Sequence, residues 1–212
     1  SLDRKNVCSA SDGNGGAIIT WSDNRNSNWD IYAQRVNSVG TVLWQSNGIA
    51  ISNSADNQDQ TSITDDGIGG GIISWMDFQS GGVSLYAQRI NSNGEVLWSD
   101  DGIVICSLSV SNNQSRAPSL MKDNEGGAYI TWVDTRDGDK IYVQRIDQIG
   151  NFHWIESGVA VGSGTNHSNP KLVNDGGNGT IILWLQGYQT LKTQRYAANG
   201  IAQWNTGGIT LY

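Results

Sequence analysis

The chain has 212 residues, among them 27 Gly but only 2 Pro and 2 Cys, and its formal net charge is −7. An acidic chain of this kind is not expected to bind nucleic acid or an anionic membrane surface. No run of about 18 apolar residues is present, so no membrane insertion is predicted. Cys8 and Cys106 occupy non-equivalent places and are interpreted as small apolar residues rather than a disulfide framework. Ser1 is interpreted as the start of a mature or excised fragment.

One sequence pattern occurs four times along the chain. A first Trp recurs every 52 to 57 residues, at Trp21, Trp75, Trp132 and Trp184. A second Trp follows it each time, at Trp44, Trp98, Trp154 and Trp204. Repeats of this length, built of short apolar runs and Gly-rich turns, are typical of propeller blades. We therefore predict an all-β fold, a β-propeller of four four-stranded antiparallel blades in one domain, residues 1–212. The predicted blades are residues 5–54, 55–110, 111–164 and 165–212.

Each copy is predicted to contain four strands, A to D in chain order. Strand A is short and ends in a hairpin of Asp, Asn and Gly, residue types that suit tight turns. The predicted A strands are Val7–Ser11, Ser62–Asp65, Ser119–Lys122 and Lys171–Asn174. Strand B, which is Ala17–Asp23 in the first copy, is almost continuously apolar, as expected of a strand buried between neighbouring blades.

Strand C alternates in polarity, and a turn ending in Gly leads to strand D, which is predicted to carry the second Trp. If the turn pairs Val36 with Thr41, Arg35 lies beside Trp44 on one side of the sheet. We interpret the repeated Gln-Arg pair on strand C as structural, with each guanidinium against an indole ring in a cation–π contact. The four Arg residues of these pairs are then not expected to form an anion-binding site.

The two ends of a blade differ in how much they vary among copies. The A–B and C–D turns are short and nearly identical, whereas the B–C and D–A loops differ in length and content. Both variable loops of a propeller blade emerge on one face, and binding residues usually lie on loops held by a rigid scaffold. This variable face is the predicted binding face.

The string W-x-D-x-R, followed by D-I-Y-A-Q-R-[VI]-[ND]-x-x-G-x-x-x-W, resembles tandem repeats of propeller-type domains in large bacterial secreted and cell-surface proteins. Copies one and three match it best, whereas Gln79 replaces Arg in copy two and Gln186 replaces Asp in copy four. The turn from Asn37 to Trp44 is similar to the tryptophan-docking turn of quinoprotein-type propellers, although it is one residue shorter. The first resemblance implies adhesion or recognition at a bacterial surface or outside the cell.

Trp29 has no counterpart in the other copies and sits in a polar B–C loop. Its ring suits a sugar face or a protein contact; the alternative is that it folds back onto its own loop. Aromatic residues in other B–C loops add to this face. The predicted ligand-binding residues are Asp23, Arg25, Trp29, Phe78, Arg136 and Tyr188.

Asp23, Asp77 and Asp134 each end a strand B, and this repetition counts against catalysis, which needs carboxyl groups of unlike pKa. The densest acidic cluster is Asp134, Asp137 and Asp139, which is the one candidate for a calcium site but lacks the complete loop pattern. A solvated acidic loop is the favoured interpretation, and no cofactor is predicted.

The sequence favours a non-catalytic, lectin-like adhesion module that binds a glycan or a protein, so no enzyme is predicted. Two alternatives stay open: an assembly segment of a larger surface protein or half of an eight-bladed ring, and a glycan-active enzyme, for which no carboxylate pair is evident. A monomer closed within the chain is favoured narrowly over a head-to-tail dimer.

Overall fold

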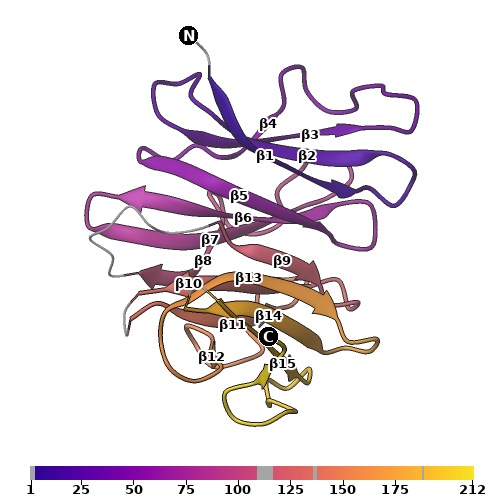
Figure 1. Ribbon diagram of the computed structural model, residues 1–212. Coiled ribbons are helices and arrows are strands. Elements are labelled where there is room, and N and C mark those ends of the chain that lie inside the picture. The colour runs from indigo at the N-terminus through magenta and orange to yellow at the C-terminus, as the bar shows by residue number, and fades with distance from the viewer. Residues whose placement is uncertain (1–2, 109–116, 136–137, 188) are drawn as a thin grey trace.

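The computed structural model describes residues 3–108, 117–135, 138–187 and 189–212, and it confirms four four-stranded antiparallel sheets (Figure 1). In each sheet the strands lie side by side in chain order. The first sheet contains β1 (Arg4–Ser11), β2 (Ala17–Asp23), β3 (Asp30–Val36) and β4 (Ile49–Ser52). The second contains β5 (Asn57–Asp65), β6 (Gly71–Gln79), β7 (Gly82–Ile90) and β8 (Ile103–Leu108). The third contains β9 (Ser119–Lys122), β10 (Ala128–Asp134), β11 (Lys140–Ile146) and β12 (Val159–Val161). The fourth contains β13 (His167–Asn174), β14 (Thr180–Gln186), β15 (Thr190–Tyr196) and β16 (Ile209–Thr210).

Three details of the predicted strands were wrong. The A strands β1, β5 and β13 begin three to five residues earlier than expected, because each contains a bulge that hides its strand pattern. Strand D begins after the second Gly of its segment, so the second Trp precedes the strand instead of lying in it. The C–D turn brings Val36 opposite Val42 rather than Thr41.

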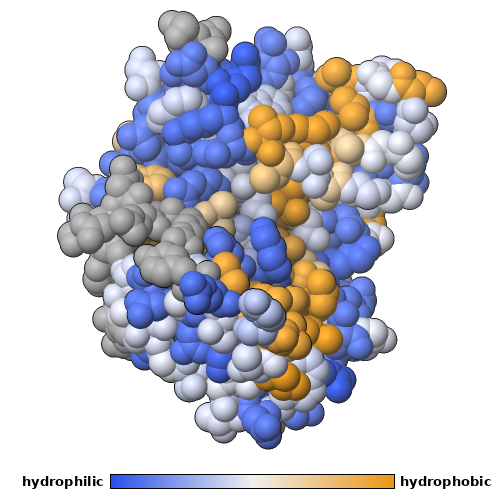
Figure 2. Space-filling model, viewed as in Figure 1, coloured by the Kyte–Doolittle hydropathy of each residue, from blue (hydrophilic) through white to orange (hydrophobic). Residues whose placement is uncertain are grey.

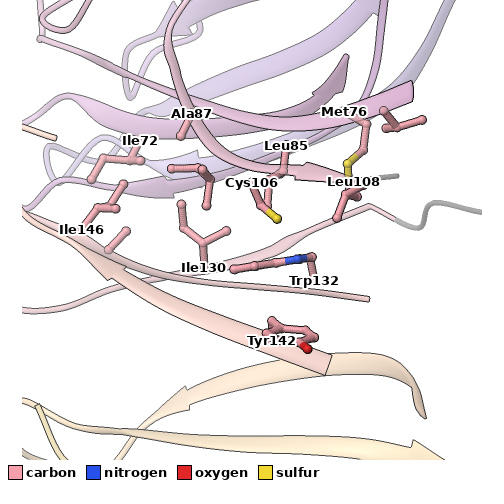
Figure 3. Close-up of a cluster of buried hydrophobic side chains, with 13 residues drawn as sticks. Ile72, Met76, Leu85, Ala87, Cys106, Leu108, Ile130, Trp132, Tyr142 and Ile146 are labelled. Atoms are coloured by element: carbon pink, nitrogen blue, oxygen red, sulfur yellow. The ribbon is translucent and has the colours of Figure 1, made fainter. Parts of the chain in front are cut away.

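The hydrophobic core lies between the sheets, not within one of them. One cluster joins the first and second sheets, a second joins the second and third, and a third joins the third and fourth. Figure 3 shows the middle cluster, in which Ile72 and Leu85 of one sheet face Ile130 and Trp132 of the next. Each blade is therefore stable only against a neighbour, as the continuous apolar character of the B strands predicted.

The repeated Arg of strand C makes an ion pair that the sequence analysis missed. Its guanidinium binds the Asp that opens the A–B turn of the same sheet, and the shortest N···O distances are 2.8–2.9 Å in all four copies. In the first copy, Asp12 also accepts hydrogen bonds from the backbone N–H groups of Asn14 and Gly16, so one carboxylate fixes both the turn and strand C. The predicted packing of Arg on Trp is replaced by this Asp–Arg pair.

The second Trp of each of the first three blades docks on the next blade. The Trp44 indole N–H donates to the carbonyl oxygen of Ser92 at 3.0 Å. A Cβ placed on Gly94, two residues further on, would lie 3.1 Å from the Trp44 ring, so only Gly leaves room for the indole. We call this contact the Trp–Gly joint. It recurs between Trp98 and the Gln148–Gly150 turn, and between Trp154 and the Ala198–Gly200 turn.

The four sheets form a stack with the first sheet at one end and the fourth at the other (Figure 1). In the part of the chain that the structure describes, no hydrophobic cluster contains residues of both end sheets. Figure 2, in the same view, shows hydrophobic residues gathered along the right side, where the β3–β4 connection lies in Figure 1. That connection carries the exposed side chains of Val39, Val42 and Leu43.

Candidate functional site

The first B–C loop and the following D–A loop lie together at one end of the blades, in agreement with the predicted variable face, and they contact the A strands β1, β5, β9 and β13, here called the inner strands, at β5. The first B–C loop binds the following D–A loop directly: the Asn28 amide donates to the carbonyl oxygens of Ser54 and Asp56. The backbone N–H of Gln58, at the start of β5, donates to the carbonyl oxygen of Trp29 at 2.6 Å. These contacts place Trp29 beside the inner strands β1 and β5.

A bulge interrupts three of the four inner strands close to this end. Its first residue has a positive φ although it is not Gly: Asn6 at 52°, Gln60 at 57° and Asn169 at 54°. Such a conformation costs about 1–3 kcal/mol per residue and is found mainly where surrounding structure imposes it, often at functional sites. The three bulges occupy equivalent positions in their blades.

The bulges line one cavity of about 540 Å³ into which all four blades contribute. Most of its lining side chains are polar, and its carboxyl group is that of Asp59. The lining residues are Asn6, Asp59, Gln60, Ala117, Asn169, Pro170 and Lys171. We call this space the axial cavity.

Asp59 is the most strongly held charge of the axial cavity. One carboxylate oxygen forms an ion pair with the Lys5 ammonium at 2.6 Å. The other accepts hydrogen bonds from the Asn6 amide, the Ser22 hydroxyl and the backbone N–H of Gln60. Burial raises the pKa of Asp59, but the hydrogen bonds from Lys5, Ser22 and Asn6 outweigh burial and leave that pKa below its usual value. Asp59 is therefore an ionised carboxylate at neutral pH and not a proton donor.

Trp29 and Lys5 connect the variable face to this carboxylate. The Lys5 ammonium lies 4.0 Å from the centre of the Trp29 ring, while it also binds Asp59. The Trp29 backbone N–H donates to the Asn57 side chain, and the indole is half-buried. The ring thus leans toward the inner strands instead of extending freely into solvent. An aromatic ring, a cation and a carboxylate are held together here by residues of β1, β5 and the first B–C loop.

One hydrogen-bond acceptor of the axial cavity has no donor among the described residues. The side-chain carbonyl oxygen of Gln60 is buried and accepts no hydrogen bond from the residues that the structure describes. A buried acceptor without a donor costs free energy, and a ligand hydroxyl or a water would relieve it.

Asp23 and Arg25, two of the predicted ligand-binding residues, hold the first B–C loop in place. The Asp23 carboxylate is buried and binds the guanidinium groups of both Arg4 and Arg25. The hydrogen bond from Arg25 holds the pKa of Asp23 far below its usual range. The Arg25 guanidinium also lies 3.8 Å from the centre of the Tyr32 ring.

Phe78 is half-buried against the core between the second and third sheets, opposite Asn57 in the strand register. Phe78 and Trp29 therefore both neighbour Asn57, but the Phe78 side chain packs into the hydrophobic cluster between the second and third sheets. The predicted residues Arg136 and Tyr188 lie outside the described residues.

Asp137 of the proposed calcium site also lies outside the described residues. Of its two partners, Asp134 is buried and Asp139 is exposed. Within the described ranges no group of three His, Cys, Asp or Glu side chains could hold a metal ion. The calcium site stays a prediction.

Asp77 is another buried carboxyl group near this end of the molecule. Burial raises the pKa of Asp77, whose carboxylate faces Ser54 and Gln58. Gln58 lies opposite Asp77 in the β5–β6 pairing, so neighbouring Asp59 points to the other face of the sheet. Asp59 and Asp77 consequently do not form a facing carboxyl pair.

The axial cavity was missed because its polar amide residues and Asp59 were assigned to the D–A loops or left before the first strand. The positions of Asn6, Gln60 and Asn169 precede the predicted A strands, where a bulge breaks the alternation of polarity. A repeated polar amide side chain at that position was the signal in the sequence.

No protein-family model matches the chain, and no curated protein is significantly similar to it in sequence. Solved structures are similar in fold. A protein of unknown function from Dyadobacter fermentans aligns with a TM-score of 0.61 at 8% identity, covering 94% of this chain and 67% of that one. A thermostable family-43 glycoside hydrolase aligns at 0.52 with 13% identity, covering 92% and 73%. The native arabinanase of Bacillus subtilis aligns at 0.50 with 13% identity, covering 97% and 76%.

These comparisons correct the prediction of a non-catalytic adhesion module. That prediction relied on analogy with binding propellers, whereas two of the similar structures reported above are named as a glycoside hydrolase and an arabinanase. The β-propeller fold of this chain is thus shared with enzymes that act on carbohydrates, and it no longer supports the exclusion of catalysis. No helix in the described part of the chain is long and apolar enough to cross a membrane.

Proposed function

We propose that the chain is a glycan-active enzyme domain whose substrate binds in the axial cavity beside Trp29. The observation that carries this proposal is the ionised Asp59 carboxylate, fixed by Lys5 in a cavity that all four blades border. The similarity to carbohydrate-active enzymes supports it. Enzymes acting on polymeric glycans work where those polymers are, so we place the protein outside the cell.

The chemistry of the cavity suits a sugar. The amide groups of Asn6 and Gln60 can hydrogen-bond hydroxyl groups, and the buried Gln60 oxygen needs a donor. The Trp29 ring offers an apolar face next to the Lys5–Asp59 pair. Asp59 fits the ionised carboxylate of a glycosidase, which acts as base, nucleophile or stabiliser of positive charge in the oxocarbenium-like transition state. The second group such a reaction needs, a proton donor, is not supplied by another carboxyl group among the described residues of this cavity.

Hydrolysis assays on a panel of polysaccharides, including arabinan and xylan, test the proposal. We expect new reducing ends with at least one member of the panel. Replacing Asp59 with Asn should lower kcat by about 100-fold or more, because removal of one positioned catalytic group typically costs 10²–10⁴ in rate. Binding without turnover of any glycan would refute the proposed enzyme.

Asp65→Asn is the matched control, since Asp65 also pairs with a lysine, Lys122, but at the A–B turn end of β5. It should leave turnover unchanged. Trp29→Ala should raise KM about 10-fold or more and leave kcat nearly constant, as expected for an aromatic contact made equally in ground and transition states. Equal effects of Asp59→Asn and Asp65→Asn would contradict the assignment of Asp59.

A further inference from the structure

The end sheets carry the two unused halves of a blade-to-blade interface. Three Trp–Gly joints connect the four blades, and each joint needs a Trp from one blade and a Gly turn from the next. Among the described residues, Trp204 of the fourth blade has no hydrogen-bond acceptor for its indole N–H, and a Cβ on Gly40 of the first blade would meet nothing within 4 Å. Trp204 and Gly40 thus each lack the partner that would complete a further joint.

The ion pairs of strand C also indicate that the fourth blade lacks a following neighbour. The guanidinium groups of Arg35 and Arg89 also donate to the next blade, to the carbonyl oxygens of Ser92 and Gln148 at 2.9 and 2.8 Å. Neighbouring blades cover these side chains, of which 12% and 7% is exposed, whereas 44% of the equivalent Arg195 side chain is exposed. Arg195 therefore lies on a face that in the first two blades is covered by a following blade.

The outer face of the first blade, at the opposite end of the array, is exposed as well. Val7 in the β1 bulge is 65% exposed, but the equivalent Thr61 in β5 is 1% exposed. Thr61 is buried because it packs on the first blade: its hydroxyl lies 3.2 Å from that of Thr20, and its carbonyl accepts from Cys8. The outer face of β1 lacks such a preceding blade.

We propose that these two faces bind one further blade of the same repeat, joined to the array, which closes the ring. Its Gly turn receives Trp204, and its own Trp docks on Gly40 and the carbonyl of Ser38. The ends of the array lie on either side of the axial cavity: Asn6 and Lys171 line it together, and the Lys171 charge lowers the pKa of Cys8 against the raising effect of burial. Because both end blades border one cavity, a single blade is enough to join them, whereas a second copy of the chain would bring four.

An inner strand of the added blade would border the axial cavity as the other four do. The inference does not depend on the proposed glycan chemistry, because it rests only on repetition of the interface.

A five-blade variant tests the inference. Residues 53–108, which comprise a D–A loop and the β5–β8 blade, are repeated after Tyr212 of the full chain. We expect this variant to be monomeric by light scattering and to melt about 5–10 °C above the original chain, because the two added interfaces together should contribute several kcal/mol and each kcal/mol shifts Tm by about 2–4 °C.

Trp204→Ala and Val7→Asp each weaken the proposed interface at one end of the four-blade array. In the five-blade variant, each should remove most of the gain in Tm, whereas in the original chain each should shift Tm by no more than about 2 °C. Ile201→Ala, an exposed change in the same C–D turn region as Trp204, is the control and should alter neither. An unchanged Tm on adding the blade would overturn the proposal. So would a harmless Val7→Asp in the five-blade variant, which would leave the ring open. A concentration-dependent dimer of the original chain that Trp204→Ala dissociates would assign the faces to a second copy instead.

Discussion

Replacing Arg89 with Ala should destabilise the protein far more than the same change at Arg195, although both residues make the same ion pair. The Arg89 guanidinium donates two hydrogen bonds to one oxygen of Asp66 and a third to the carbonyl of Gln148. The side chains are 7% and 0% exposed, so the substitution leaves a buried carboxylate without its counter-charge. Breaking a buried pair in this way typically costs about 3–5 kcal/mol.

The exposed pair serves as the internal reference. The Arg195 side chain is 44% exposed, and solvent screens its attraction to Asp175. Loss of an exposed pair typically costs about 1 kcal/mol or less. Urea denaturation followed by tryptophan fluorescence should therefore show a stability loss for Arg89→Ala that exceeds the loss for Arg195→Ala by about 2 kcal/mol or more.

A double variant separates loss of the charge pair from loss of packing. If the unpaired Asp66 is the main cost, Arg89→Ala combined with Asp66→Asn should recover part of the lost stability, because no charge is then left buried and the Asn side-chain oxygen can still accept from the turn N–H groups of Ile68 and Gly70. Equal losses at Arg89 and Arg195, or a double variant that is less stable than Arg89→Ala by the full cost of a second independent change, would refute this reasoning.

Two further predictions concern the joints and the pH dependence. Gly94→Ala should cost about 1 kcal/mol more than Gly40→Ala in urea denaturation, because both positions have positive φ but only at Gly94 would the added Cβ lie 3.1 Å from a Trp ring; equal costs would contradict the packing role of the joint. Burial lowers the pKa of His167 below its ordinary value, so the unfolded chain takes up a proton first as the pH falls. The His167 contribution to stability is then constant above about pH 6.5 and decreases below it, by at most about 1.4 kcal/mol per pH unit. His167→Asn should flatten the stability profile between pH 6.5 and 5, and a profile with unchanged slope would show that other groups dominate.

The fold could be predicted from the sequence because each blade repeats the same physical requirements. The two Trp rows, the Gly turns and the apolar B strands recur in register, and all four sheets follow them. The Asp–Arg pair recurs with equal regularity, yet it escaped prediction. The Asp of the A–B turn was interpreted as a turn former alone, and its partner Arg, about 20 residues away, was assigned to the nearer Trp.

The site could be predicted only in part. Trp29 was singled out because no other copy has a Trp there, and the structure places it beside Lys5, which pairs with Asp59 of the axial cavity. Asp59 was not singled out, because it lies in a segment assigned to a loop, just before a bulge that breaks the alternation of polar and apolar residues along the strand. The role of Asp59 becomes visible only in the folded structure, because Lys5 and Asn6, more than 50 residues earlier in the sequence, contact it from the neighbouring blade.

The Trp–Gly joint has a consequence for how such chains can change over generations. The joint consists of an indole, a residue without a side chain and a backbone carbonyl, so it makes no demand on the side chains of the loops at the other end of the blade. A duplicated or exchanged blade would dock on its new neighbour without compensating substitutions. The loops around the axial cavity are therefore free to diverge from blade to blade, so unequal recombination between repeats could alter specificity without altering the scaffold.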